Sequence, residues 1–335
     1  IELKKSLNIN TVTHGYRSSK EFFEKAFGSS GNCNMNVNCP DGNDWEYQKR
    51  SAVMLVSGSS GFCSGALINN TQNDGKPYVL TANHCYSNPT SWIFRFNWES
   101  NGCSNPNSSP SFQSLSGAIL RARRTPSDFC LVEITGGLSG GTIPGSFNAF
   151  FSGWNNQNTA PTSSVCVHHP SGDIKKISFD YNNASNAGNY WDINSWDDGT
   201  TEPGSSGSPL FDGNSHRIVG QLYGGTASCT SLTYDTYGKV SSSWGNGMRN
   251  YLDPDNTGAN VLDGMDAIEI PDPELSYNAS DISFELEIDD SASSSFTISN
   301  TGELDSELSY TINSSPFESS IGGPDGGGYF WTDSN

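Results

Sequence analysis

The chain has 335 residues and a formal net charge of −19, and 33% of its residues are apolar. It contains no apolar run of eighteen residues, so we expect no membrane span. The acidic balance argues against nucleic acid or an anionic membrane as a partner. Most of the charge lies in residues 269–335, which contain 14 Asp and Glu and no Lys or Arg, so that residues 1–268 carry only −5. The length predicts two domains, or one large all-β domain with a smaller one.

The pattern of short strands dominates the chain after an N-terminal extension, residues 1–27, in which residues 19–27 predict a short amphipathic helix. Strand patterns recur from Cys33 to about Val261, separated by turns rich in Asn, Asp, Gly and Pro. A dozen short strands with no long helical period indicate an all-β fold of barrels or a sandwich, with antiparallel strands. The clearest expected strands are residues 52–56, 65–68, 78–81, 92–96, 117–120, 129–134, 165–167 and 217–222.

The C-terminal part differs in composition from the rest. A short helix is expected to end at Arg249–Leu252, and Pro271–Pro273 is the best candidate linker. Beyond it, three alternating segments (282–288, 295–298 and 308–312) resemble the opening strands of a small Ig-like β-sandwich module of secreted bacterial proteins. A complete module needs about seven strands, so this one looks cut short. We therefore divide the chain into the extension 1–27, a main domain 28–268 and an acidic, incomplete module 269–335.

The cysteines indicate an oxidising compartment. Eight are present, and none forms a C-x₂-C pair, which weakens a zinc-site interpretation. An even number spread over about two hundred residues is typical of disulfides in a secreted protein. Spacing alone leaves 105 pairings open among positions 33, 39, 63, 85, 103, 130, 166 and 229.

A glycine-flanked turn, Gly204–Pro209, offers the strongest candidate for a reactive side chain. Ser206 lies between glycines, which let the backbone turn sharply before the apolar segment Leu210–Phe211. Such a turn can direct the N–H groups of Gly204 and Ser206 at one point, forming a pocket for a developing oxyanion. Read alone, the segment is more simply a surface turn, because a serine is a weak nucleophile without a base nearby.

Two other segments supply the missing base and acid. His84 follows the apolar strand 78–81 and precedes Cys85, where a histidine is well placed as a general base. Asp128 comes directly before the strongly apolar segment 129–134, where a partly buried carboxylate needs a partner. Each residue alone is more simply a surface or turn residue. Together, the order His84, Asp128, Ser206 matches that of the chymotrypsin-like serine proteases.

More specifically, residues 28–265 resemble the lysyl endopeptidases, a secreted bacterial branch of that fold. The resemblance rests on segments 61–67, 81–85, 127–129, 167–170, 175–178, 201–209, 220–225, 237–240 and 252–254. It implies two antiparallel β-barrels with the site between them. It also implies that Ser206 attacks the peptide carbonyl, that His84 moves its proton, and that Asp128 orients His84. The N–H groups of Gly204 and Ser206 would hold the oxyanion.

The resemblance also locates a specificity pocket. A lysine side chain needs a carboxylate there, because an unpaired buried ammonium is very costly. Trypsin-like enzymes carry it six residues before the nucleophile, where this chain has Thr200. The lysyl endopeptidase pattern has an Asp just before a Tyr-Gly pair, which Asp235 matches, with Asp197 and Asp198 as the fallback.

The substrate-facing strand carries one departure from the family. Gly224 and its neighbours would pair with the substrate backbone. Tyr223 stands where the family has a histidine, and the loop between Ser178 and Trp191 that normally carries a Trp partner is shortened. Loss of that stacked pair would change the surroundings of His84 or widen the pocket toward Arg.

The resemblance further implies the disulfides Cys33–Cys229, Cys39–Cys103 and Cys63–Cys85, and we pair Cys130 with Cys166 by remainder. It indicates an extracellular, secreted enzyme made as a zymogen, because residues 1–27 resemble the end of a pro-region, with a retained arm as the alternative. We expect no cofactor and, since the sequence has no EF-hand-like loop, no metal. We expect protein or peptide substrates with exposed Lys, and a monomer. Two alternatives stay open: a protease-fold module for binding or adhesion with little activity, and a serine protease of broader Lys/Arg or of acidic-residue preference.

Overall fold

The computed structural model describes residues 27–267, 275–277 and 298–300. The strands β1 to β18 belong to one compact unit, and β19 (Leu275–Tyr277) and β20 (Ile298–Asn300) belong to another, where they pair antiparallel. The expected helix over residues 19–27, the linker at 271–273, and nearly all of the three segments expected for an Ig-like module lie outside the described residues. The module and the domain boundaries therefore stay predictions.

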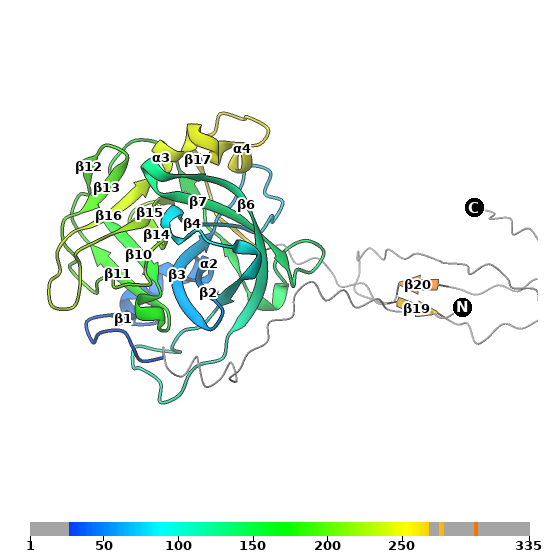
Figure 1. The fold of residues 1–335 in the computed structure, drawn as a ribbon, viewed down its shortest axis with the longest axis horizontal. Coiled ribbons are helices and arrows are strands. Elements are labelled where there is room, and N and C mark those ends of the chain that lie inside the picture. Colours follow the sequence, from blue (N-terminus) through cyan, green and yellow to red (C-terminus); the bar gives the residue numbers. More distant parts are fainter. Residues whose placement is uncertain (1–26, 268–274, 278–297, 301–335) are drawn as a thin grey trace, which may run out of the picture. The chain divides into compact units, whose positions relative to one another are not determined.

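The first half of the main unit is a closed six-stranded barrel, in the order β2-β3-β4-β7-β6-β5. Its strands are antiparallel and lie side by side in Figure 1. The inward side chains of these strands, mostly valine, leucine, isoleucine and phenylalanine, fill the barrel. The bounds are β2 Ala52–Ser57, β3 Ser60–Leu67, β4 Tyr78–Ala82, β5 Trp92–Phe96, β6 Gln113–Arg124 and β7 Phe129–Gly136.

The second half is built on one larger sheet, with the main order β1-β11-β10-β14-β15-β16-β13-β12 (Figure 1). The all-β prediction is confirmed, but within the described residues only the first half closes into a barrel, and β9 pairs with β15 in parallel. The bounds are β1 Met35–Asn36, β8 Phe150–Phe151, β9 Trp154–Asn155, β10 Ser164–His168, β11 Lys176–Asp180, β12 Ser185–Ala187, β13 Tyr190–Ile193, β14 Pro209–Asp212, β15 Ile218–Gly225, β16 Asp235–Lys239, β17 Val261–Leu262 and β18 Met265–Asp266.

Helices are few and short. The predicted helical segment at Arg249–Leu252 is confirmed as α4, whereas α2 (Glu46–Ser51) was not expected from the sequence. A helix this short has no full apolar stripe, so periodicity could not reveal it. The others are α3 Val240–Ser243, the π-helix η7 Trp244–Met248, and the 3₁₀ turns η1 Pro40–Trp45, η2 Asn83–Cys85, η3 Pro89–Ser91, η4 Thr125–Ser127, η5 Gly145–Phe147 and η6 Pro170–Gly172. No helix of the described part is long and apolar enough to cross a membrane.

One apolar cluster joins the two halves. Leu80 and Leu131 of the barrel are fully or almost fully buried against Val167, Phe211 and Ile218 of the larger sheet. Burial of aliphatic and aromatic side chains of this size stabilises by about 1.5–3 kcal/mol each. The two halves are thus held together by a shared core, and loops from both meet along its edge.

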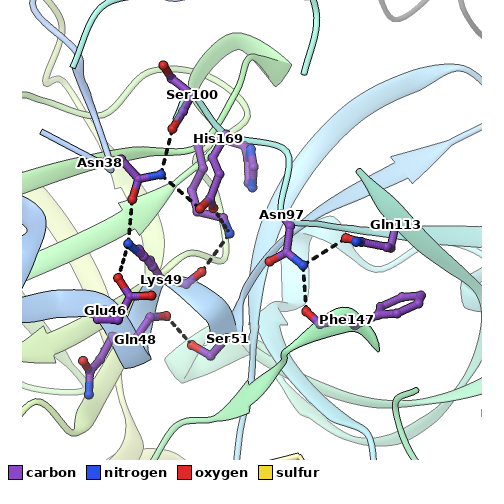
Figure 2. Close-up of polar contacts among 12 residues, drawn as sticks. Asn38, Glu46, Gln48, Lys49, Ser51, Asn97, Ser100, Gln113, Phe147 and His169 are labelled. Carbon is purple, nitrogen blue, oxygen red and sulfur yellow. Dashed lines mark hydrogen bonds and ion pairs between the residues drawn. The ribbon is translucent and has the colours of Figure 1, made fainter. Parts of the chain in front are cut away.

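Polar contacts fix the segment that leads into the barrel. Lys49 Nζ of α2 donates to Asn38 Oδ1 (2.6 Å), and Asn38 Nδ2 donates to the Ser100 carbonyl oxygen (2.7 Å), while Glu46 forms an ion pair with Lys49 (Figure 2). Lys175, at the end of the loop that precedes β11, joins this network because its Nζ donates to the Lys49 carbonyl oxygen (2.7 Å). The contacts anchor chain segments that are distant in sequence around the loop that precedes β11.

Three disulfides are present: Cys33–Cys229, Cys39–Cys103 and Cys63–Cys85, the three that the resemblance implied. The pairing of Cys130 with Cys166 is wrong, because both are free and buried. Cys130 lies on β7 in the barrel core and Cys166 on β10 in the core of the larger sheet, so the fold places them in different clusters. Burial raises the pKa of each thiol to about 12.

Candidate functional site

His84 and Asp128 meet because their strands are neighbours. β4 and β7 pair antiparallel, with Ala82 opposite Phe129 at the end of the ladder. The chain that leaves β4 and the chain that enters β7 therefore turn outward at the same edge of the barrel. His84 lies in the 3₁₀ turn after β4, and Asp128 lies one residue before β7.

The contact between the two residues is bidentate. His84 Nδ1 is 2.7 Å from Asp128 Oδ2, and the His84 backbone N–H donates to Asp128 Oδ1 (2.9 Å). A carboxylate accepts only, so Nδ1 carries the proton and Nε2 of the neutral ring is left as an acceptor. The Asp128 side chain is 3% exposed and that of His84 is 39% exposed. The pair is thus fixed from its buried side and open on the other.

Asp128 adopts an unusual backbone conformation. Its φ is +49°, in the left-handed region, which Asp and Asn tolerate better than most residues. Its carbonyl oxygen accepts from the Asn83 N–H (2.7 Å), so the backbone of the η2 turn and the side chain of Asp128 hold each other in place.

The turn that carries Ser206 packs directly on the barrel. The Ser64 N–H of β3 donates to the Ser206 carbonyl oxygen (2.8 Å), and Ser64 Oγ donates to the Gly204 carbonyl oxygen (3.0 Å). Gly207 has a φ of +80°, and a Cβ there would lie 2.1 Å from Thr81 Oγ1 and 2.7 Å from the Ala82 nitrogen. Only glycine permits this approach of the turn to the strand end that precedes His84.

The amide groups of the turn divide into two sets. The N–H groups of Ser205, Gly207 and Ser208 donate to backbone carbonyls. Within the described part of the chain, those of Gly204 and Ser206 donate no hydrogen bond. Gly204 has a φ of +98°, which orients its peptide group in a way that few other residues allow. Two unused donors, one on Ser206 itself and one two residues before it, are available to an external oxygen atom.

The Cys63–Cys85 disulfide lies between the histidine and the serine turn. Cys85 Sγ is 3.8 Å from the Ser206 carbonyl oxygen, and a His84 ring nitrogen lies within 4.8 Å of both sulfurs. In the part that the structure describes, these three residues are also the one group with ligand-like spacing for a metal. Both sulfurs are bonded to each other, so they are not thiolate ligands.

A surface groove of about 480 Å³ begins at His84. It continues along the end of β15 and is lined by His84, Tyr223, Gly224, Gly225, Thr226, Tyr234 and Thr236. Gly224 pairs with Thr236 of β16 on one side, whereas β14 pairs with β15 only at residues before Leu222. One edge of β15 beyond Leu222 therefore has no strand partner in the described structure, and it can accept an extended peptide.

Tyr223 contacts the histidine from within this groove. Its ring meets the His84 ring edge-on, with centroids 6.0 Å apart, and the side chain is 50% exposed. Tyr190, in the shortened segment before Trp191, packs against Tyr223 with centroids 5.5 Å apart. The sequence suggested that an aromatic pair beside His84 is lost; the structure contains a tyrosine pair there.

Asp235 is almost fully buried, with 1% of its surface exposed. Its Oδ2 accepts from Trp196 Nε1 (2.7 Å) and from Thr201 Oγ1 (2.6 Å). Burial raises the pKa of this carboxyl, an effect that the two hydrogen bonds oppose. Among the described residues, Asp235 forms no ion pair, so its charge is balanced by hydrogen bonds alone. A buried carboxylate without a counter-charge is a group with which a cation could pair.

The other two acidic candidates lie elsewhere. Asp197 and Asp198 are exposed, and they accept from the backbone N–H and the hydroxyl of Tyr181. Thr200 is fully buried, and its carbonyl oxygen accepts from Ser178 Oγ (2.9 Å). Of the sequence candidates, Asp235 is thus the carboxylate buried beside the β15 groove residues, since it pairs with Gly225 in the sheet.

Sequence reasoning missed the residues that hold this arrangement. Ser64, Trp196 and Thr201 each make hydrogen bonds to the candidate groups, but none has a pattern of its own. Ser64 lies inside a family-like segment, 61–67, so that segment was the available signal. Thr201 likewise lies inside the family-like segment 201–209, whereas Trp196 becomes visible only when the fold brings it to Asp235.

The comparisons with known proteins agree with this geometry. The family model described as "Lysyl endopeptidase, C-terminal domain" matches residues 27–238, which is more than half of the chain. The chain belongs to the lysyl endopeptidase family. A lysyl endopeptidase of Pseudomonas aeruginosa is 28% identical over 240 residues, which cover 64% of this chain and 50% of that protein. The chain thus spans about half the length of this relative.

Solved structures of low identity also match. Human heparin binding protein is 16% identical, with a TM-score of 0.43 over 61% of this chain and 93% of that one. A thermostable serine protease, AL20, from an extremophilic microorganism is 17% identical, with a TM-score of 0.41 over 59% of this chain and 94% of that one. Membership of the lysyl endopeptidase family rests on the sequence matches and does not depend on these structures.

Proposed function

We propose that this chain is a secreted serine endopeptidase of the lysyl endopeptidase family that cleaves peptide bonds after lysine. The observation that supports the hydrolase most is the bidentate contact of His84 with Asp128, next to a serine turn with two unused N–H donors. A base, an orienting acid, a hydroxyl and an oxyanion site are the parts that acyl transfer requires.

The proposed reaction has two stages. Ser206 Oγ attacks the substrate carbonyl carbon while His84 Nε2 takes the hydroxyl proton, and Asp128 stabilises the imidazolium that forms. The carbonyl oxygen becomes an oxyanion, which accepts from the N–H groups of Gly204 and Ser206. Collapse of this intermediate breaks the C–N bond, and His84 gives its proton to the leaving amine. A water molecule then hydrolyses the acyl-enzyme by the same steps.

Lysine preference is proposed from Asp235. The substrate would lie extended along β15 at Tyr223 and Gly224, with its side chain before the cut bond directed toward this carboxylate. The buried, raised-pKa carboxyl of Asp235 gains a partner when an ammonium enters, and no arginine or lysine of the described part already occupies that role. Thr200, at the trypsin-like position, supplies no charge.

The remaining expectations go with this proposal. Three disulfides agree with an oxidising, extracellular location. We keep residues 28–268 as the protease domain, residues 1–27 as an N-terminal extension or pro-region remnant, and residues 269–335 as a separate acidic module. The proposed enzyme is a monomer, acts on proteins or peptides with exposed lysine, and needs no cofactor.

Two measurements test the proposal. An organofluorophosphate should label the full chain at Ser206 and nowhere else, and a Ser206→Ala variant should stay unlabelled. A native chain that is folded and unlabelled would instead be a binding module. Digestion of a mixed peptide pool should give cuts after Lys. Equal cutting after Arg would indicate broader specificity, and predominant cuts after Glu or Phe would refute the assignment of Asp235.

A further inference from the structure

His168, at the end of β10, is a fully buried histidine that the proposed reaction does not use. It is hydrogen-bonded on both ring nitrogens. Nδ1 lies 2.8 Å from Ser205 Oγ, and Nε2 lies 3.0 Å from Ser178 Oγ. Ser205 is the residue before the proposed nucleophile, so a buried imidazole is in contact with the nucleophile turn itself.

The direction of each hydrogen bond follows from the proton inventory. Ser178 Oγ donates its one hydrogen to the Thr200 carbonyl oxygen (2.9 Å). It can therefore only accept from His168, which places the imidazole proton on Nε2. Nδ1 is then an acceptor, and Ser205 Oγ must donate to it. Ser205 Oγ in turn accepts from the Glu202 N–H (3.2 Å).

The result is one continuous chain of hydrogen bonds with a single direction. It runs from the Glu202 N–H through Ser205, His168 and Ser178 to the Thr200 carbonyl oxygen. Burial and the nearby charge of Lys176 lower the pKa of His168 to about 3, so the ring stays neutral and keeps this tautomer. Both ends of the segment 200–205 are thereby tied to strands β10 and β11.

We propose that His168 is a positioning residue that fixes the turn of Ser206 and the segment before it through this chain of hydrogen bonds. The proposal rests on the proposed function, because it assigns His168 to the geometry of that reaction. A hydroxyl and two N–H donors must be held within about 0.5 Å to act together. The Ser205 side chain is fully buried and its hydroxyl contacts His168 of β10, so His168 holds the residue directly before the nucleophile.

Two conservative variants separate the two bonds of the ring. The amide of asparagine reaches the position of Nδ1, so His168→Asn keeps an acceptor for Ser205 and loses the bond to Ser178. The amide of glutamine reaches the position of Nε2, so His168→Gln keeps the bond to Ser178 and loses the acceptor for Ser205. Each variant loses one hydrogen bond of the same kind, and we expect their melting temperatures to fall by similar amounts.

Catalysis should distinguish them. With a lysine ester substrate, kcat of the Gln variant should fall about 10–100-fold, the range that a misplaced reacting group produces. The fold-decrease in kcat of the Asn variant should be less than about a third of that of the Gln variant. The KM of the Gln variant should change little. The rate at which an uncharged organofluorophosphate labels Ser206 should follow kcat, because this reagent does not need the lysine pocket.

The matched control is His169→Gln. His169 is a neighbouring buried histidine outside this chain of hydrogen bonds. The control variant should have a lower melting temperature without a comparable loss in kcat.

A double-mutant cycle and a spectrum complete the test. Once Ser205→Ala has removed the donor, adding His168→Gln should cost less than about twofold more in kcat, because contacting residues are not additive. Nitrogen NMR of the full chain should show His168 protonated on Nε2 at neutral pH. Losses in kcat that simply follow the melting temperature, additive losses in the cycle, or a proton on Nδ1 would each overturn the proposal. If the native chain neither hydrolyses nor labels, the proposed function fails, and the NMR result still decides the hydrogen-bond chain.

Discussion

Replacing Asp235 by asparagine should have opposite effects on activity and stability. Asparagine has the same shape, and its carbonyl oxygen can still accept from Trp196 and Thr201, the two donors that bind Oδ2. The negative charge, however, is lost from a position that is 1% exposed. A lysine ammonium that enters the pocket would then be buried without a counter-charge. Removing one partner of a buried ion pair costs about 3–5 kcal/mol, so kcat/KM for a lysine ester should fall by at least about 10²-fold.

The stability of the free protein should change in the other direction. Burial raises the pKa of Asp235, so the folded state favours the protonated form more than the unfolded state does. Below the pKa that Asp235 has in the unfolded chain, the group is protonated in both states and does not lower the free energy of unfolding. As pH rises through the higher pKa of Asp235 in the folded protein, the carboxylate forms and the free energy of unfolding falls. At pH 7 the Asn variant should melt at a higher temperature than the native chain. At about pH 3 the two should melt together.

The assay compares initial rates on lysine and leucine esters with thermal melts at both pH values. Asp192→Asn is the matched control, because Asp192 lies on the neighbouring strand and accepts from Thr236 Oγ1 while being only half-buried. This control should leave the lysine-to-leucine ratio unchanged. An Asp235→Asn enzyme that keeps its lysine preference would show that another group recognises the substrate charge. Equal losses on both esters would indicate damage to the fold.

Three further results follow from the structure. Asp128→Asn keeps a residue that tolerates the left-handed φ of +49° but removes the charge that holds His84, so kcat should fall by about 10⁴-fold with little loss of stability; a loss below tenfold would contradict the role of this carboxylate. Gly207→Ala places a methyl group 2.1 Å from a side chain of the barrel, so the free energy of unfolding should drop by more than about 2 kcal/mol and Ser206 should no longer be labelled; a stable, active variant would refute this packing. Alkylation of the unreduced protein should modify no cysteine while it is folded and two, Cys130 and Cys166, after unfolding in denaturant, since burial raises each thiol pKa to about 12; four or more modified cysteines would mean that the disulfides differ.

Much of the barrel was predictable because its strands are long and apolar. Segments such as 52–56, 78–81 and 129–134 are buried along almost their whole length, so their composition alone indicates strands. β11, β13 and β16 were not predicted. They contain Lys, Asp and Gly, and their strand conformation depends on neighbours in the sheet and not on a pattern of their own.

The candidate site was predictable to the extent that it has local signatures. His84, Asp128 and Ser206 each lie at a strand end or in a glycine turn, and these settings are visible in the sequence. The hydrogen bonds of His168 and Ser64 are not, because their partners are many residues distant in the chain. The pairing of Cys130 with Cys166 failed for a related reason. These two cysteines remain after the other six are paired, but only the fold shows that they belong to different cores.

The proposed machinery is shared between the two halves of the main unit. His84 and Asp128 come from the barrel, whereas Ser206 and Asp235 come from the larger sheet. The apolar cluster that contains Leu80 and Phe211 joins the two halves. A ribosome-bound chain that has finished only the barrel therefore holds an acid and a base with nothing to activate. Under the proposed function, hydrolysis therefore begins only after the second half has been synthesised and docked.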